Sequence, residues 1–287
     1  MNDRPPVARR LRMSDGVAVH LSDYPTDGSD RPVILSTHGL QSHAGWYEWS
    51  GRFLQSRGYP VWFFDRRGSG RSDGPRGHVR SADRLLADVR AIRRLAAEET
   101  GRPVVLMGVC WAAKLLAASA AESPDGLAAV VLAYPAFRTR FDPSLRQRLL
   151  LSLAGWAGIS RRPVLSPLRP EHFTDNMAAR RFIADDPLAT RTLSVEMARA
   201  DRELSQRLDS SLRSLQVSTR VVLCGRDRIV RPESVRRLMT AAVPHASIQT
   251  EPSAAHVLEF EPDRERIYSA IADWLDETTH GVGKTDR

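Results

Sequence analysis

Short apolar runs alternate with segments of helical spacing along most of this chain, and this alternation limits its fold more than any other feature. The predicted strands cover residues 7–13, 17–23, 32–38, 60–64, 104–107, 127–132, 219–223 and 247–250. Predicted helices follow many of them, at 45–58, 81–100, 232–242 and 264–275 and directly after residue 112. Strands separated by helices form βαβ units, whose sheets are mostly parallel with both faces covered. We therefore expect an α/β fold with a mostly parallel, roughly eight-stranded sheet.

The alternation stops once, between residues 141 and 212. This stretch favours helix and is rich in leucine at its start, and Pro163, Pro167 and Pro170 interrupt its middle. We interpret it as a helical cap inserted into the fold. The chain then divides into a core of residues 1–140 and 213–287 and a cap of residues 141–212.

Residues 102–118 have the layout of a nucleophile elbow, which is a strand, a tight turn and a helix with a reactive side chain at the turn. Cys110 occupies the turn, and Gly108, Ala112 and Ala113 are small enough for the strand and helix to approach closely. A side chain in this place lies at a helix N-terminus, where free N–H groups favour a negative charge such as a thiolate. The alternative is that Cys110 is a small buried apolar residue, as free cysteines often are.

Two further side chains that carry chemistry follow predicted strands, Asp227 after residues 219–223 and His256 after residues 247–250. Ligands of open parallel sheets bind outside the carboxyl ends of the strands. Cys110 would attack a carbonyl as a thiolate, His256 would transfer the proton, and Asp227 would orient the imidazole. Asp227 could instead be a turn residue paired with a neighbouring arginine, and His256 could cap a helix or fill space.

The turn after residues 32–38 supplies the remaining part of such a site. The backbone N–H groups of Leu40 and Trp111 would form an oxyanion hole for the developing negative charge. His38 is interpreted as a packing residue beneath this turn, and His43 and His78 as surface residues of loops.

Composition excludes several classes of function. The net charge of +8 comes almost entirely from arginines interleaved with acidic residues, which predicts no nucleic-acid groove and at most weak contact with anionic surfaces. The two cysteines are expected too far apart for a disulfide, and no run approaches the roughly twenty apolar residues of a membrane span. We expect a cytoplasmic protein without a metal or cofactor.

The loops that follow the predicted strands carry further motifs. These are His38-Gly39-Leu40 with Ser42-His43, the Gly-rich loop from Asp65 to Val79, Gly225-Arg-Asp-Arg-Ile-Val230, and Ala255-His-Val-Leu-Glu259. Together they resemble the α/β-hydrolase superfamily and, more closely, its monoacylglycerol lipase and lysophospholipase-like group, over roughly residues 10–277. The resemblance implies a lidded pocket that accepts an acyl chain and the chemistry of a serine hydrolase.

The elbow departs from that group. Where the group has Gly-His-Ser-x-Gly-Gly, this chain has Gly108-Val-Cys-Trp-Ala-Ala113. This version resembles the elbow of dienelactone hydrolases, in which a cysteine nucleophile is followed by small residues. A thiolate attacks esters and thioesters well, and the acyl-thioester that it forms is more reactive than an ester toward amines, thiols and carbanions.

We therefore expect a hydrolase of carboxylic esters, thioesters or lactones with a small-molecule acyl substrate. Leu150, Trp156 and Phe173 of the predicted cap would line its apolar groove, unless they only pack the cap on the sheet. Two alternatives remain, an acyltransferase of specialised metabolism and a non-catalytic binding protein of the same fold. The oligomeric state is left open.

Overall fold

A computed structural model describes residues 4–142 and 163–279. In this part of the chain, eight strands form one sheet in the order β1-β2-β4-β3-β5-β6-β9-β10. The strands are β1 (Val7–Arg12), β2 (Ala18–Tyr24), β3 (Val33–Thr37), β4 (Val61–Phe64), β5 (Val104–Val109), β6 (Leu127–Ala133), β9 (Thr219–Cys224) and β10 (Ser247–Glu251). The six neighbouring strands β4, β3, β5, β6, β9 and β10 pair in parallel, whereas β2 pairs antiparallel with both β1 and β4. The predicted α/β sheet is confirmed.

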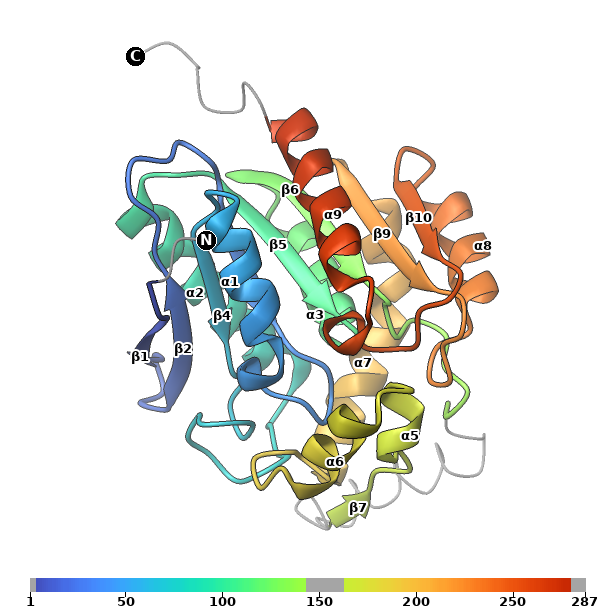
Figure 1. Cartoon of the computed structure of the whole chain (residues 1–287). Coiled ribbons are helices and arrows are strands. Elements are labelled where there is room, and N and C mark those ends of the chain that lie inside the picture. Colours follow the sequence, from blue (N-terminus) through green and yellow to red (C-terminus); the bar gives the residue numbers. More distant parts are fainter. Residues whose placement is uncertain (1–3, 143–162, 280–287) are drawn as a thin grey trace.

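Helices cover both faces of this sheet, as the parallel strands require. In Figure 1, α1 (Glu48–Ser56) and α9 (Arg264–Thr279) lie in front of the sheet, and α2 (Ala82–Thr100) and α3 (Ala112–Glu122) lie behind it. The helix α7 (Val195–Arg213) packs on α3 and also contacts α2 and α8 (Pro232–Ala242). A short 3-10 helix, η1 (Ala44–Tyr47), leads into α1, and another, η2 (Leu258–Phe260), precedes α9.

The helix α2 illustrates how local sequence sets these elements. Its apolar residues Leu85, Val89, Ile92 and Ala96 recur at helical spacing and are buried. The Ser81 hydroxyl accepts a hydrogen bond from the Arg84 N–H at 3.2 Å and caps the first turn. Gly101 ends the helix at a φ of 64°, a conformation that glycine adopts without steric cost.

Residues 163–194 of the predicted cap lie at the end of the sheet toward which the parallel strands point (Figure 1). They form β7 (Pro163–Leu165), α5 (Pro170–Phe173), α6 (Met177–Asp185) and β8 (Thr192–Ser194), with α7 after them. The strands β7 and β8 pair with each other in a separate two-stranded sheet. The apolar side of α7, by contrast, belongs to the core, with Leu204, Leu208 and Leu212 buried. The division of the chain at residues 141–212 stays a prediction.

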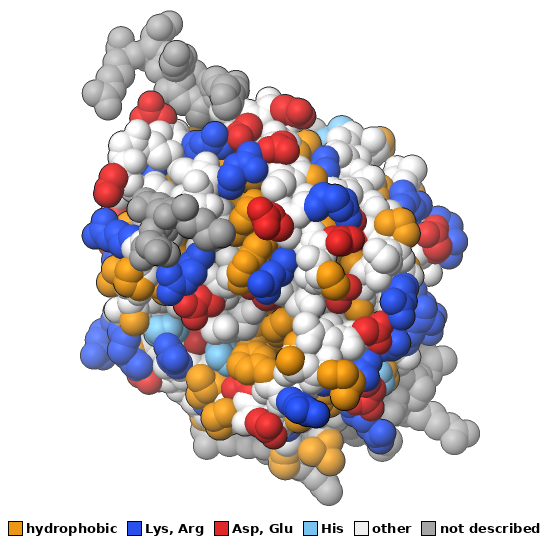
Figure 2. Space-filling view, viewed as in Figure 1, with side chains coloured by type: hydrophobic (Ala, Val, Ile, Leu, Met, Phe, Trp, Pro, Cys, Tyr) orange, Lys and Arg blue, Asp and Glu red, His pale blue; other side chains and the backbone are white. Residues whose placement is uncertain are grey.

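The surface mixes charged and apolar side chains. Figure 2 shows apolar groups, interspersed with charges, in the lower half of the same view. Leu165, Met177 and Phe182, which belong to β7 and α6, are exposed large apolar residues. None of the helices in the described ranges is both long enough and apolar enough to cross a bilayer.

Candidate active site

Cys110 lies at the junction of β5 and α3 in a strained backbone conformation. Its φ is +53°, in the left-handed region that residues other than glycine rarely adopt. Two hydrogen bonds to the end of β6 and the turn after it hold Cys110 there: the Cys110 N–H donates to the Ala133 carbonyl, and the Ala136 N–H donates to the Cys110 carbonyl, each at 3.0 Å. The neighbouring strand therefore fixes the turn, and such strain often marks functional sites.

The small residues around the turn are required by a close approach of strand and helix. A Cβ added to Gly108 would lie 2.6 Å from the Ala113 Cα. Any larger residue at position 108 would push α3 away from β5. This contact explains why position 108 is a glycine.

His256 and Asp227 lie in contact at the ends of β10 and β9. The His256 Nδ1 donates to the Asp227 Oδ2 at 2.7 Å, and both side chains are buried. The other carboxylate oxygen, Oδ1, accepts from the Ile229 and Val230 N–H groups, each at 2.7 Å. Because Nδ1 faces the carboxylate, the His256 Nε2 is left for proton transfer; it is buried and has no hydrogen-bond partner among the described residues.

The charges around His256 favour its protonated form. Burial lowers the pKa of the imidazole, but the Asp227 carboxylate and the Cys110 thiolate outweigh this effect and raise the pKa to about 10. A thiolate and an imidazolium stabilise each other in this arrangement. The site therefore favours the imidazolium form of His256.

The turn after β3 passes directly against Cys110. A Cβ added to Gly39 would lie 3.2 Å from the Cys110 Cβ and 3.3 Å from its Sγ. The next residue is Leu40, and Trp111 follows Cys110 itself. The structure thus brings the elbow and the predicted oxyanion turn into contact.

Comparison with known proteins gives the family of the chain. The sequence profile of the serine aminopeptidase S33 family, a group of hydrolases, matches residues 28–263. The chain belongs to the S33 family of α/β hydrolases. This confirms the superfamily that the loop motifs resemble.

Two relatives of this S33-family hydrolase span nearly its whole length. The monoacylglycerol lipase of Mycolicibacterium smegmatis is 26% identical over 270 residues, which cover 91% of this chain and 93% of the relative. Human monoglyceride lipase is 25% identical over 281 residues, which cover 94% of this chain and 90% of the relative.

Solved structures share the fold. The monoacylglycerol lipase of Paleococcus ferrophilus superposes with a TM-score of 0.79 at 24% identity, over 91% of this chain and 99% of that one. A soluble variant of the Saccharomyces cerevisiae monoglyceride lipase, solved with a substrate analogue, has a TM-score of 0.85 at 16% identity, over 97% of each chain.

Trp111 of this S33-family hydrolase is anchored to α7. Its indole Nε1 donates to the Asp201 Oδ1 at 2.7 Å, and the buried Lys114 ammonium donates to the same oxygen at 2.7 Å. Lys114 also donates to the Ser205 hydroxyl at 2.8 Å. Lys114 and Asp201 were not predicted as site residues. Their shared contact could be predicted only in part. The i, i+3 spacing of Trp111 and Lys114 places both on one side of α3, but Asp201 lies too far along the chain for a local pattern to identify it.

Phe173 is the one predicted groove residue that lies in the described part of the chain; Leu150 and Trp156 lie outside it. The Phe173 ring centre is 6.1 Å from that of His256 and 5.6 Å from that of Trp46. The Val257 N–H donates to the Phe173 carbonyl at 2.9 Å. The helix α5 is thus attached beside the candidate catalytic histidine.

The prediction for His43 is wrong. This residue was interpreted as a surface residue, but it is buried and its Nε2 donates to the Asp186 Oδ2 at 3.0 Å. The Trp46 Nε1 donates to the same oxygen at 2.6 Å. Asp186, which follows α6, therefore joins the predicted cap to the segment that leads into α1.

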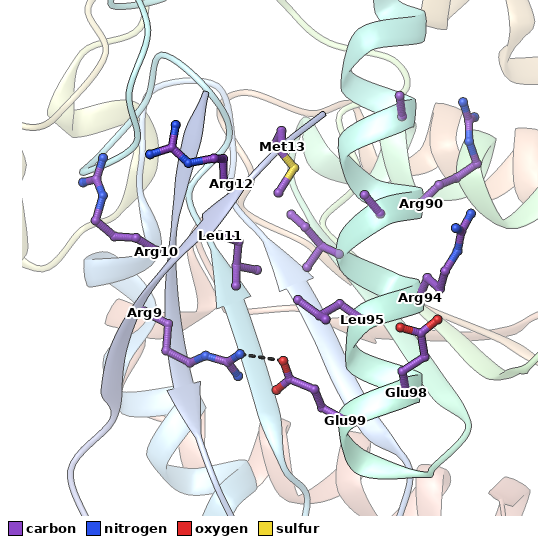
Figure 3. A pocket seen from close by; sticks show the side chains of 13 residues that line it. Arg9, Arg10, Leu11, Arg12, Met13, Arg90, Arg94, Leu95, Glu98 and Glu99 are labelled. Atoms are coloured by element: carbon purple, nitrogen blue, oxygen red, sulfur yellow. Dashed lines mark hydrogen bonds and ion pairs between the residues drawn. The ribbon is translucent and has the colours of Figure 1, made fainter. Parts of the chain in front are cut away.

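A surface groove of about 510 Å³ lies elsewhere, between β1 and α2 (Figure 3). Its apolar floor includes Leu11, Met13 and Leu95, and arginines surround it. Arg9 is paired there with Glu99 at 2.8 Å. Cys110, His256 and Asp227 do not line this groove. Within the described ranges, no cluster of three or more His, Cys, Asp or Glu residues is suited to a metal ion.

Proposed function

We propose that this protein hydrolyses a carboxylic ester, thioester or lactone through Cys110, His256 and Asp227. The observation that carries the proposal is the buried 2.7 Å contact of His256 with Asp227, next to a cysteine in a strained elbow. A buried histidine held by a carboxylate in one tautomer is the arrangement that general acid–base catalysis needs. A binding protein would not need this arrangement, which disfavours the non-catalytic alternative.

In the first step, the Cys110 thiolate attacks the substrate carbonyl and forms a carbon–sulfur bond. The carbonyl electrons move to the oxygen, and the Leu40 and Trp111 N–H groups stabilise the resulting oxyanion. When the tetrahedral intermediate collapses, the bond to the leaving group breaks and the His256 Nε2 donates its proton to that group. An acyl-thioester on Cys110 remains.

In the second step, water replaces the leaving group. Neutral His256 removes a proton from the water, and the hydroxide attacks the acyl-thioester. Collapse of the second tetrahedral intermediate releases the carboxylic acid, and the sulfur leaves as the thiolate beside the imidazolium. Asp227 stabilises that imidazolium in both steps.

For the substrate we propose an ester with an apolar acyl group, as the names of the monoacylglycerol lipase relatives suggest. The position of Phe173 beside His256 supports an acyl groove at this end of the site. If this side chain only packs the cap, variants that shorten Phe173 should affect short and long acyl substrates equally.

An acyltransferase is the second candidate, and the cysteine at the elbow favours it. A thioester acylates amines, thiols and carbanions more readily than the ester that a serine would form. Product analysis separates the two reactions. With an activated acyl ester in water, hydrolysis gives only the free acid, whereas a transferase gives a new acyl product when a nucleophilic acceptor is added.

Mass spectrometry of the intact protein tests the catalytic proposal. After incubation with p-nitrophenyl acetate, we expect the wild type to gain one acetyl group that peptide mapping places on Cys110. Cys110→Ala should gain none. Cys224→Ala, which removes the other free cysteine, is the matched control and should be acylated like the wild type. Acylation at another residue, or none at all, would refute the proposal.

A further inference from the structure

Arg66 is a buried cation at the end of β4, close to the candidate site. Its exposed fraction is 3%, and its Nε has no hydrogen-bond partner among the described residues. Burial lowers the pKa of the guanidinium to about 10, so it remains protonated at neutral pH. Within the described chain it forms no ion pair with a carboxylate. A buried charge of this kind is costly unless other interactions compensate it.

The contacts of Arg66 reach both parts of the proposed oxyanion hole. Its Nη2 donates to the Gly39 carbonyl at 2.8 Å and contacts the Leu40 carbonyl oxygen at 3.4 Å. Its guanidinium carbon lies 4.5 Å from the centre of the Trp111 ring, a cation–π distance. The Arg66 side chain therefore contacts both the turn that contains the Leu40 N–H and Trp111, whose backbone N–H is the second proposed donor.

The bond to Gly39 has an electronic consequence, because the Gly39 carbonyl and the Leu40 N–H belong to the same peptide group. A cation that binds the carbonyl oxygen withdraws electrons from the peptide and makes its N–H a stronger donor. Hydrogen bonds that share a group strengthen one another in this way, and bonds to ionised groups do so most.

His38 adds a second donor to the same carbonyl. Its Nε2 accepts from the Arg66 backbone N–H at 3.1 Å, which leaves the proton of the neutral ring on Nδ1, 2.8 Å from the Gly39 oxygen. Burial and the Arg66 charge hold the pKa of His38 well below its ordinary value, so the ring is neutral. His38 is thus part of the support of this turn, in addition to its predicted packing role.

We propose that Arg66 is a positioning residue that orients and polarises the Gly39–Leu40 peptide and supports Trp111, and thereby strengthens the oxyanion hole. This inference rests on the proposed function of Cys110. When the thiolate attacks, its negative charge moves from the Cys110 sulfur to the oxyanion, which the Leu40 and Trp111 N–H groups bind.

Two reactions of Cys110 separate this role from a purely structural one. Acylation by p-nitrophenyl acetate passes through an oxyanion, whereas alkylation by iodoacetamide occurs at a saturated carbon and forms none. Both rates are measured in Arg66→Met and Arg66→Lys from low pH to the plateau at which the thiol is fully ionised. Comparison at the plateaus removes any effect of the Arg66 charge on ionisation of the thiol.

In Arg66→Met, we expect the plateau rate of acylation to fall about 10- to 100-fold, somewhat less than the loss caused by removing an oxyanion donor. The plateau rate of alkylation should stay within about twofold of the wild type, since it needs no oxyanion hole. Arg66→Lys keeps the charge and one donor and should recover part of the acylation rate. Arg71→Met, an exposed position of the same loop, is the matched control and should change neither rate.

Several results would overturn the inference. An unchanged ratio of acylation to alkylation in Arg66→Met would mean that Arg66 does not act on the oxyanion hole. Thermal unfolding shows whether Arg66→Met is folded. If it is not, the ratio of acylation to alkylation is measured in Arg66→Lys instead, and a ratio equal to that of the wild type refutes the proposal. If the wild type is alkylated but never acylated, the proposed function fails and this inference fails with it.

Discussion

Trp111, the residue directly after the candidate nucleophile, is hydrogen bonded to Asp201 on α7 at 2.7 Å. Asp201 also accepts from Lys114, so one carboxylate joins the first turn of α3 to a helix 90 positions further along the chain. The backbone N–H of Trp111 is one of the two proposed oxyanion donors. The position of that donor therefore depends on how α7 packs against α3.

Asp201→Ala should weaken both the fold and the reaction. The Lys114 ammonium is buried, and without its carboxylate it loses a charged partner, which costs about 1–3 kcal/mol of unfolding free energy. Asp201→Asn keeps an acceptor for Trp111 but loses the charge, so its acylation rate should lie closer to that of the wild type. Urea unfolding and acylation kinetics measure the two effects. A stable Asp201→Ala protein with normal acylation would show that this anchor has no role.

Replacement of Cys110 by serine tests how the nucleophile is activated. Serine is a much weaker acid and needs His256 to remove its proton during attack, whereas a preformed thiolate does not. We expect Cys110→Ser to lose most of the esterase activity and Cys110→Ala to lose all of it, with both proteins still folded. Steady-state hydrolysis and circular dichroism provide the measurements. Equal or higher activity of the serine variant would indicate a site built for serine.

The stability of the protein should decrease at alkaline pH because of His256. The pKa of this group in the folded protein is raised from 6.5 to about 10, since Asp227 and the Cys110 thiolate outweigh the effect of burial. The protonated form therefore stabilises the fold, fully below pH 6.5, and this contribution is lost as the pH rises through about 10.

His256→Gln removes this titration and serves as the comparison. The free energy of unfolding, measured in urea at several pH values, should fall less steeply for the variant than for the wild type across that range. Parallel curves for the two proteins would contradict the assignment of the alkaline loss to His256.

Glu259 should destabilise the protein once it ionises. Burial raises the pKa of its carboxyl group to about 7, and Oε2 has no hydrogen-bond partner in the described chain. A raised carboxyl pKa means that stability is lost as the pH rises from about 4.5 to about 7. Glu259→Gln keeps an oxygen for the Ser50 N–H, which now donates at 2.9 Å, and removes the charge.

We expect Glu259→Gln to gain about 1 kcal/mol above pH 7 and to gain little at pH 4, where the wild-type carboxyl is also neutral. Urea unfolding at these pH values checks the difference. A variant that is destabilised above pH 7 but not at pH 4 would show instead that the ionised carboxylate stabilises the core.

Much of the fold follows from local patterns. The apolar runs predicted the strands of the sheet, and the helical spacing of Leu85, Val89 and Ile92 predicted α2. The spacing of apolar residues shows that a segment is an amphipathic helix, but it does not show whether that helix belongs to a cap or to the core. The predicted cap therefore includes α7, although α7 packs on α3. Amphipathic spacing identifies the apolar face of a helix but not the surface against which that face packs.

The sequence by itself determined which reactive side chains follow the carboxyl ends of the parallel strands. It therefore determined that Cys110, Asp227 and His256 lie at the same end of the sheet. This holds because all such strands point the same way. Only the tertiary structure decided the positive φ of Cys110, the bond of Trp111 to Asp201 and the placement of Arg66 against Gly39. These features depend on contacts between segments that are distant in the chain, and local propensity carries no information about such contacts.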